Sequence, residues 1–244
     1  MSRVLITGAT SGLGYQLCLD YHNLGFEVVA CGRSHEKLAE KFGALNDVKA
    51  LCFDVTNKES VTSAFTSLST PPDIWILNAG DCQYIDNGDL SSDIIARNIE
   101  TNFMSVVYCL SQIQLVAKPG TQIVVVGSIA SEFTFPRAEG YGASKAALQY
   151  LVNSLAIDWR DKPVVLSLAM PGFIDTPLTQ KNTFSMPMMI SPQKASQMLR
   201  DGIEKRKPVI YFPRVFGWIV RTLGVLPYSW QRKLMMLLLP KETV

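Results

Sequence analysis

The chain begins with a short apolar segment that leads directly into a glycine-rich turn, and this feature constrains the fold most. Residues 3–6 (RVLI) predict a buried strand, residues 7–14 (TGATSGLG) a tight turn, and residues 14–21 have the apolar spacing of a helix. Glycines let the backbone approach a pyrophosphate closely, and a helix N-terminus supplies amide donors and the positive end of its dipole. The glycines are spaced GxxxGxG (Gly8, Gly12, Gly14) instead of the commoner GxGxxG. The strand–turn–helix order still favours a dinucleotide site over a turn without a ligand.

Length and composition describe one globular domain. A chain of 244 residues, 48% hydrophobic and 18% charged, is long enough to bury a sizeable core. The formal net charge of +2, without a basic tract interleaved with aromatics, argues against a nucleic-acid partner. Five scattered cysteines without a CxxC pair fit reduced thiols in a cytosolic protein and predict no metal site. The first residues lack the features of a signal peptide, so we expect one cytoplasmic domain over residues 1–244.

Apolar runs recur along the chain and predict further buried, parallel strands. They cover residues 25–33, 51–56, 74–80, 123–126 and 164–169, and residues 208–214 could supply a last strand. Helical patterns lie between them at residues 58–68, 94–118 and 143–159. The third strand ends in Asp54-Val55-Thr56 and the fourth in Asn78-Ala79-Gly80, and sheets of this class bind ligands at such strand ends. A strand-end aspartate such as Asp54 is often only a helix cap.

The end of the second strand bears on the choice of cofactor. An acidic residue there would receive the ribose 2′-hydroxyl of NAD, whereas an arginine can pair with the 2′-phosphate of NADP. The strand ends in Arg33, and no carboxylate follows until Glu36. This favours NADPH. The alternative is a surface arginine that only caps the strand.

A serine, a tyrosine and a lysine form the candidate catalytic group. Ser128 follows the apolar run 123–126, so it would emerge at the carboxyl end of a buried strand and could donate to a substrate oxygen. Tyr141 and Lys145 are four residues apart, which places them on one face if a helix begins near Tyr141. A phenol with a pKa near ~10 is a poor acid–base at neutral pH, and an ammonium beside it favours the phenolate. Taken alone, YxxxK is equally compatible with a chance pair on a solvated helix.

Asn102 lies among apolar neighbours within the helical stretch 94–118. Asparagine costs helix propensity in such a position, which suggests that it has a task there. The alternative is a buried amide whose hydrogen bonds are satisfied.

Two later segments differ from the alternation of strands and helices. Residues 178–190 are rich in methionine and suit either a substrate lid or ordinary packing, and Ser191 and Pro192 predict the start of another helix. Residues 215–239 are apolar with interspersed basic residues, and no uninterrupted run approaches the ~18 residues of a membrane span. Three interpretations stay open for them. The segment could be an arm that covers the cleft or a dimer interface. It could be a surface helix that dips into a membrane, with Arg221, Arg232 and Lys233 near the headgroups. It could also be part of the hydrophobic core.

Together these motifs resemble the short-chain dehydrogenase/reductase family over about residues 1–205. The resemblance rests on seven elements in the family's order and spacing: TGxxxGxG from Thr7 to Gly14, Asp54-Val55, Asn78-Ala79-Gly80, Asn102, Ser128, Tyr141-xxx-Lys145, and Pro171-Gly172 followed by Thr176. It implies an α/β fold: a doubly wound, Rossmann-like parallel sheet of about seven strands with helices on both faces, in a single domain.

The resemblance also implies roles for the candidate residues. Tyr141 would protonate the carbonyl oxygen during reduction, and Lys145 would lower the pKa of Tyr141 and bind the nicotinamide ribose. Ser128 would orient the carbonyl, and Asn102 would hold a water in a proton relay. The implied cofactor contacts are Gly8, Thr10, Ser11, Gly12, Leu13, Gly14, Arg33, Asp54, Val55, Asn78, Ala79, Gly80, Tyr141, Lys145, Pro171, Gly172, Ile174 and Thr176.

The chain departs from the family pattern in two places. Some NADP-dependent members carry a basic residue just before the second motif glycine, where this chain has Ser11. The divergent arm at about residues 209–244 replaces the short tail through which many members form tetramers, so we expect a homodimer, with a tetramer as the alternative.

The sequence therefore predicts an enzyme that uses NADP(H) in preference to NAD(H) to reduce a ketone or aldehyde, or to run the reverse reaction. The apolar lid and arm favour a lipophilic substrate. A protein of the same fold that senses NADP(H) without turnover is an alternative, and so is a small sugar-nucleotide epimerase or dehydratase.

Overall fold

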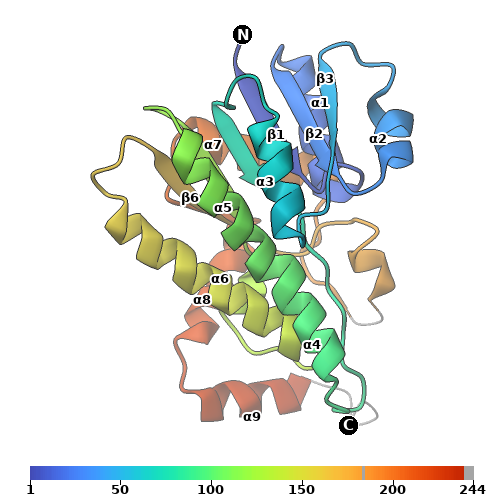
Figure 1. Cartoon of the computed structure of the whole chain (residues 1–244). Coiled ribbons are helices and arrows are strands. Elements are labelled where there is room, and N and C mark those ends of the chain that lie inside the picture. The colour runs from blue at the N-terminus through green and yellow to red at the C-terminus, as the bar shows by residue number, and fades with distance from the viewer. Residues whose placement is uncertain (183–184, 239–244) are drawn as a thin grey trace.

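The computed structural model describes residues 1–182 and 185–238 and is built on a seven-stranded parallel sheet (Figure 1). The strand order is β3-β2-β1-β4-β5-β6-β7. The strands are β1 (Arg3–Thr7), β2 (Glu27–Gly32), β3 (Val48–Cys52), β4 (Ile74–Leu77), β5 (Gln122–Val126), β6 (Val165–Pro171) and β7 (Val209–Phe212). The order runs outward in opposite directions from β1 and β4. The chain therefore leaves these two strands toward opposite sides and creates a crevice at their carboxyl ends.

Helices cover both faces of the sheet (Figure 1). They are α1 (Gly12–Asn23), α2 (His35–Phe42), α3 (Lys58–Thr66), α4 (Ser92–Ile99), α5 (Ser105–Val116), α6 (Glu139–Asp158), α7 (Pro192–Glu204), α8 (Arg214–Gly224) and α9 (Tyr228–Leu238). Successive strand residues point to opposite faces. Leu5 and Trp75 accordingly belong to the core shared with α3, α5, α6 and α8, whereas Ile6 and Ile76 belong to the core shared with α1, α2 and α7. The doubly wound fold expected from the sequence is confirmed.

The third strand lies at Val48–Cys52 and not at residues 51–56. It pairs in register with β2 from Val28–Val48 to Gly32–Cys52, so the ladder ends where β2 ends. Lys49 and Ala50 are exposed on this edge strand, so an apolar pattern does not reveal where the strand begins, and residues 53–56 lie beyond the end of the ladder. Asp54 and Val55 consequently follow the strand instead of ending it.

Two helices also differ from the prediction in ways that affect the site. The stretch 94–118 is divided into α4 and α5 by a π-helical turn at Glu100–Met104, which contains Asn102. Single π turns inside helices occur frequently at functional sites. The helix expected from residue 143 begins at Glu139, so Tyr141 lies in its first turn.

The two unusual segments take definite forms. The expected lid is closed at its base by a bridge between Ile174 and Ile190 and contains one helical turn, Thr179–Lys181. Residues 183–184 of that lid lie outside the described part of the chain, as do residues 239–244 of the arm. The described arm is helical and consists of α8 and α9 after β7. Within the described residues, no helix is long and apolar enough to cross a membrane.

Candidate active site

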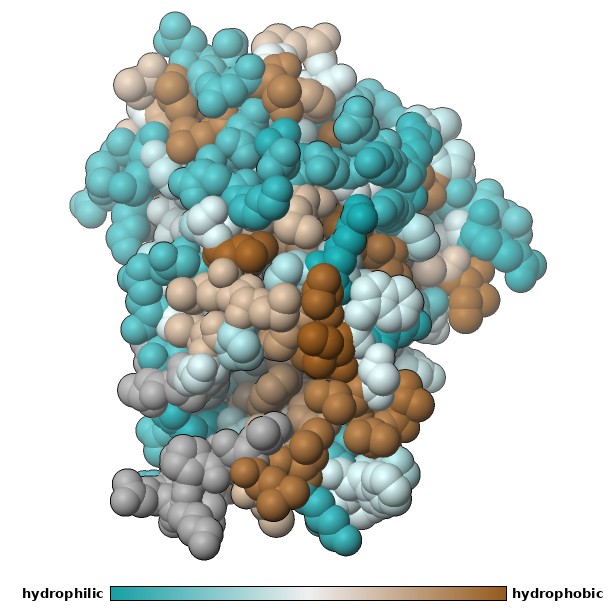
Figure 2. All heavy atoms as spheres, turned by 180° about the vertical axis from the view of Figure 1, so that it is seen from behind, coloured by the Kyte–Doolittle hydropathy of each residue, from teal (hydrophilic) through white to brown (hydrophobic). Residues whose placement is uncertain are grey.

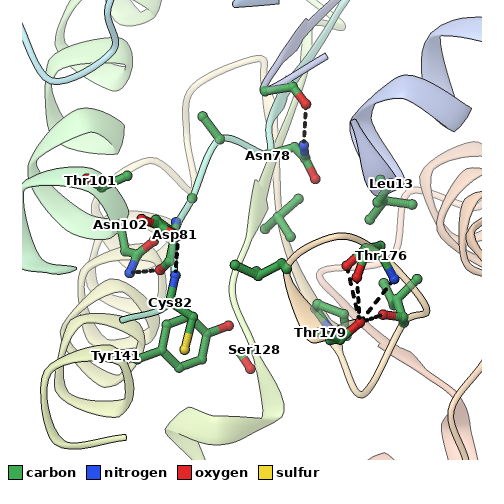
Figure 3. Close-up of a pocket in the computed structure, with 18 of the residues that line it drawn as sticks. Leu13, Asn78, Asp81, Cys82, Thr101, Asn102, Ser128, Tyr141, Thr176 and Thr179 are labelled. Atoms are coloured by element: carbon green, nitrogen blue, oxygen red, sulfur yellow. Dashed lines mark hydrogen bonds between the residues drawn. The ribbon is translucent and has the colours of Figure 1, made fainter. Parts of the chain in front are cut away.

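A cavity of about 510 Å³ lies at the carboxyl ends of the central strands. Its walls come from the glycine turn after β1, the segments that follow β2, β3, β4, β5 and β6, and the start of α6. Every candidate residue named from the sequence lines this cavity except Gly14. Residues separated by more than 160 positions are thus brought to one site, with the glycine turn at one end and Tyr141 at the other (Figure 3).

The glycine turn is compact because side chains are excluded from it. Gly8 and Gly12 have φ angles of +67° and +54°, which L side chains rarely adopt. A Cβ on Gly14 would overlap the carbonyl oxygen of Gly8 and would lie 2.6 Å from Asn78 Nδ2. Gly14 therefore acts by letting α1 start close to β1, and not by lining the cavity.

Asn78 ties the end of β4 to the glycine turn. Its Nδ2 donates to the backbone oxygens of Thr7 (3.0 Å) and Gly8 (3.4 Å), as Figure 3 shows in part. In return, the hydroxyl oxygen of Thr7 accepts the N–H groups of Asn78 (2.9 Å) and Ala79 (3.0 Å). The side chain of Asn78 thus fixes the floor of the cavity between the two strands of the crevice.

Arg33 and Asp54 lie at the far end of the cavity from Tyr141. Arg33 is exposed and lines the opening, and among the described residues its guanidinium makes no ion pair. Asp54 Oδ1 accepts hydrogen bonds from the N–H (2.9 Å) and hydroxyl (2.8 Å) of Thr56. Asp54 therefore stabilises its own turn and lines the cavity, and it is not a helix cap, because the N-cap of α3 is Asn57, whose side chain accepts the N–H of Ser60.

The hydroxyl of Tyr141 points toward Ser128 (Figure 3). Burial raises the pKa of Tyr141, nearby Cys82 raises it further, and a hydrogen bond with Ser128 opposes them. Ser128 is itself fixed, since its Oγ accepts the N–H of Ala130 at 3.1 Å. At neutral pH the phenol consequently holds its proton next to a second hydroxyl, and an acceptor oxygen in the cavity could bind both.

Lys145 is buried behind Tyr141. Its Nζ donates to the backbone oxygen of Val126 (2.9 Å) and lies 5.9 Å from the centroid of the Tyr141 ring. Burial lowers the pKa of Lys145 to about 8. The sequence predicted that Lys145 would lower the pKa of Tyr141, but burial dominates that pKa here and the tuning by Lys145 stays a prediction.

Asn102 makes three hydrogen bonds from the π turn. Its Oδ1 accepts the N–H of Asp81 (3.0 Å), and its Nδ2 donates to the backbone oxygen of Asp81 (2.9 Å) and to Ser144 Oγ (3.1 Å). Figure 3 shows this link between the loop after β4 and Asn102. The alternative interpretation, a satisfied buried amide, describes these contacts, and the water relay stays a prediction.

The wall opposite Tyr141 is the loop after β6. A Cβ on Gly12 would lie 3.0 Å from Thr176 Cγ2, so this loop closes against the glycine turn. Thr179 holds the loop in shape because its hydroxyl oxygen accepts the N–H of Thr176 at 3.0 Å, and its O–H donates to the backbone oxygen of Ile174 (Figure 3). Pro171, Gly172, Ile174 and Thr176 all line the cavity, as the resemblance implied.

Several lining residues carried no signal in the sequence. Cys82, Tyr84, Phe135 and Phe173 were not singled out, yet they line the cavity, and Cys82 and Tyr84 lie near Tyr141. Their positions depend on where the loops after β4, β5 and β6 fold, which strand periodicity does not determine. They add three aromatic rings and a thiol to the wall of the cavity.

The fold and sequence of this chain match known proteins. The family model for short chain dehydrogenase matches residues 2–186. A 3beta-hydroxysteroid dehydrogenase of Mediterraneibacter gnavus is 31% identical over 189 residues, which cover 74% of this chain and 68% of that protein. A short chain dehydrogenase structure from Burkholderia cenocepacia in complex with NADP has a TM-score of 0.84 at 23% identity and covers 98% of both chains. A structure from Burkholderia phymatum in complex with NAD has a TM-score of 0.79 at 21% identity, covering 90% of this chain and 92% of that one.

Proposed function

This chain belongs to the short chain dehydrogenase family of NAD(P)-dependent oxidoreductases, and we propose that it reduces a lipophilic ketone or aldehyde to an alcohol with NADPH, or runs the reverse reaction. The observation that carries the proposal is the hydroxyl of Tyr141, directed toward Ser128 in a cavity that extends to the glycine turn. A sensor without turnover has no need of a proton donor and a second hydroxyl at that position.

The residues at the other end fit a dinucleotide. Gly8 and Gly12 line a cradle that has no room for a Cβ at either position, and the N-terminus of α1 directs its free amides into it. Lys145 would meet the nicotinamide ribose. Gly80, which by the resemblance would pack beside the adenosine ribose, leaves no room for a side chain, since a Cβ there would lie 2.9 Å from Asn102 Oδ1. When bound, the nicotinamide supplies the hydride.

The protein's own groups do the remaining chemistry. Ser128 orients the carbonyl oxygen, and Tyr141 gives it a proton as negative charge develops there. Lys145 places a positive charge behind the ring of Tyr141. The aromatic wall from Phe135 and Phe173 excludes water and favours an apolar substrate, in keeping with the hydroxysteroid dehydrogenase among the relatives.

The preference for NADPH is supported by Arg33. Its guanidinium has no carboxylate partner among the described residues, and Gly32 beside it is packed so closely that a Cβ there would lie 2.9 Å from Thr10 Cγ2. The end of β2 therefore offers the guanidinium of Arg33, and no carboxylate, to the 2′ position of the adenosine ribose.

Replacing Arg33 with serine tests this preference. A charge-assisted hydrogen bond to phosphate contributes about 1.5–3 kcal/mol, so the Kd for NADPH should rise by roughly 10- to 100-fold while the Kd for NADH stays unchanged. Fluorescence titration of both cofactors measures this, with Arg160→Ser, at an exposed arginine between the end of α6 and the start of β6, as the control. Equal weakening of both cofactors would remove Arg33 as the selecting residue.

The reaction itself is tested by oxidation of NADPH and NADH over a panel of long-chain, cyclic and aromatic carbonyls. The proposal predicts turnover with NADPH that favours apolar carbonyls. Tight binding of NADPH without turnover on any member would instead support the sensor, and tightly retained NAD would support the sugar-nucleotide enzyme.

The homodimer and the cytoplasmic location stay predictions. Sedimentation of the full chain would check the homodimer.

A further inference from the structure

Helix α8 has two apolar faces, one that packs against the core and one that points outward. Phe216 and Val220 are buried in the core, which accounts for one side of the helix. On the other side Val215, Trp218 and Ile219 are exposed, with Trp218 65% accessible, at the i, i+3, i+4 spacing of one helical face. A surface helix with a single apolar face needs only one partner, whereas α8 has a second face that nothing in the described structure covers.

The next helix extends this surface. Gln231 is buried and donates to the backbone oxygens of Gly224 (3.1 Å) and Leu226 (2.8 Å), which fixes α9 against the end of α8. The large apolar residues of the α8–α9 turn and of α9 that remain exposed are Val225, Tyr228, Trp230, Met236 and Leu237. Figure 2 shows hydrophobic side chains gathered in a band over the lower part of this face, beside paler aromatic residues. We call this surface, residues 214–237, the arm surface.

The charge of the arm surface has one sign. It contains Arg214, Arg221, Arg232 and Lys233 and no aspartate or glutamate. These four positive charges exceed the formal net charge of +2 of the whole chain, so the rest of the chain is slightly acidic. The guanidinium of Arg221 lies 5.8 Å from the ring of Trp218, so a basic group and an aromatic ring are exposed together.

From these observations we propose that the arm surface docks on an anionic lipid bilayer. Aliphatic side chains would enter the boundary between headgroups and acyl chains, tryptophan and tyrosine would lie at headgroup level, and the basic residues would contact anionic headgroups. A second copy of this chain is a poorer occupant. A two-fold contact would oppose four positive charges to four, with no acidic residue in the patch to pair with them.

The arm surface lies next to the catalytic cavity. Phe173, which lines the cavity, contacts Phe216 on the inner side of α8, with ring centroids 5.7 Å apart. Docking would therefore hold the substrate end of the cavity close to the bilayer, where a lipophilic carbonyl is concentrated. This last step rests on the proposed function, but the docking itself does not.

Vesicle co-sedimentation of the full chain tests the docking. We expect binding to vesicles of phosphatidylcholine mixed with phosphatidylglycerol, much weaker binding to phosphatidylcholine alone, and a loss of binding at high salt. Trp75 and Trp159 are buried, so a blue shift of tryptophan emission on binding should come from Trp218 and Trp230 and should disappear in W218S/W230S. Tyr141→Phe, which removes the proposed turnover, should bind vesicles normally, so failure of the reaction and failure of docking are distinguishable.

Charge variants make the test quantitative. Replacing Arg221, Arg232 and Lys233 with glutamine should weaken binding to anionic vesicles on the order of a hundredfold, because each basic residue near such a surface contributes about 1 kcal/mol. The matched control replaces three exposed lysines on α2 and α7, Lys37, Lys41 and Lys194, and should bind like the wild type. Absence of vesicle binding at low salt would overturn the proposal. So would a dimer that W218S/W230S dissociates, since the surface would then be occupied by a second copy.

Discussion

Tyr141→Phe is expected to lower kcat for carbonyl reduction by about a thousandfold, within the range of roughly 10²–10⁴ for general acid–base catalysis, while the Kd for NADPH stays nearly constant. The variant removes one oxygen from a buried ring and keeps the packing. It also removes the proton donor that burial holds in its protonated form, and leaves Ser128 as the only remaining hydroxyl of the pair. Steady-state kinetics with the best carbonyl of the panel measures the loss.

The matched control for this variant is Tyr84→Phe. Tyr84 lines the same cavity and its pKa is also raised by burial, but no geometry assigns it the reacting oxygen. We expect its kcat to fall less than tenfold. If Tyr84→Phe loses more activity than Tyr141→Phe, the acid has been assigned to the wrong tyrosine.

Lys145→Met is expected to lower kcat by roughly a hundredfold and, at the same time, to change how stability depends on pH. Burial lowers the pKa of Lys145 from 10.5 to about 8, so at pH 7 the native state holds a costly charge that the unfolded chain holds in water. Between about pH 8 and 10.5 the native lysine loses its proton while the unfolded lysine keeps it, so the wild type gains stability as the pH rises. Methionine does not titrate, so the variant lacks this gain.

The measurement is urea unfolding of both proteins at pH 7 and near pH 10. At about 1.4 kcal/mol for each pKa unit, the wild type should gain about 2 kcal/mol relative to the variant over this range. Lys205→Met, at an exposed lysine, should change neither kcat nor the pH dependence. A stability difference that does not change with pH would mean that Lys145 is uncharged or well compensated in the native protein, and would contradict a buried ammonium that titrates beside Tyr141.

Burying the charged form of Lys145 costs free energy of folding, which a residue with only a structural role would not need to do. Its Nζ donates to the backbone oxygen of Val126, and it makes no ion pair among the described residues. Buried charges without a counter-charge are rare, and perturbed groups in a cavity are candidates for function. This supports a role for Lys145 in the reaction better than YxxxK spacing alone.

Much of this site could be predicted from the sequence because its residues are tied to strand ends. Thr7, Asn78 and Ser128 follow apolar runs, and parallel strands bring their carboxyl ends to one edge. The glycine spacing likewise follows from backbone crowding that only glycine relieves, as the overlap at Gly14 shows.

The remaining parts depend on contacts between distant segments, which periodicity does not contain. The π turn around Asn102 forms where the amide bonds to Asp81 and Ser144, and a helical pattern cannot indicate it. Strand β3 is an edge strand whose exposed residues interrupt its apolar run. Cys82 and Tyr84 line the cavity because of the path of the loop after β4. The sequence does not separate the two apolar faces of α8, because the structure is needed to show which residues are buried and which are exposed.

The central claim is that a hydride passes from a reduced nicotinamide to a carbonyl carbon in this cavity. The most direct measurement is a reaction with NADPH that carries deuterium at the transferable position of the nicotinamide, followed by mass spectrometry and proton NMR of the alcohol. We expect one deuterium on the carbinol carbon of the product, and about a thousandfold less of this deuterated alcohol when Tyr141→Phe replaces the wild type at equal enzyme and time. An alcohol without deuterium, or NADPH that binds and is never consumed, would contradict the proposed reaction.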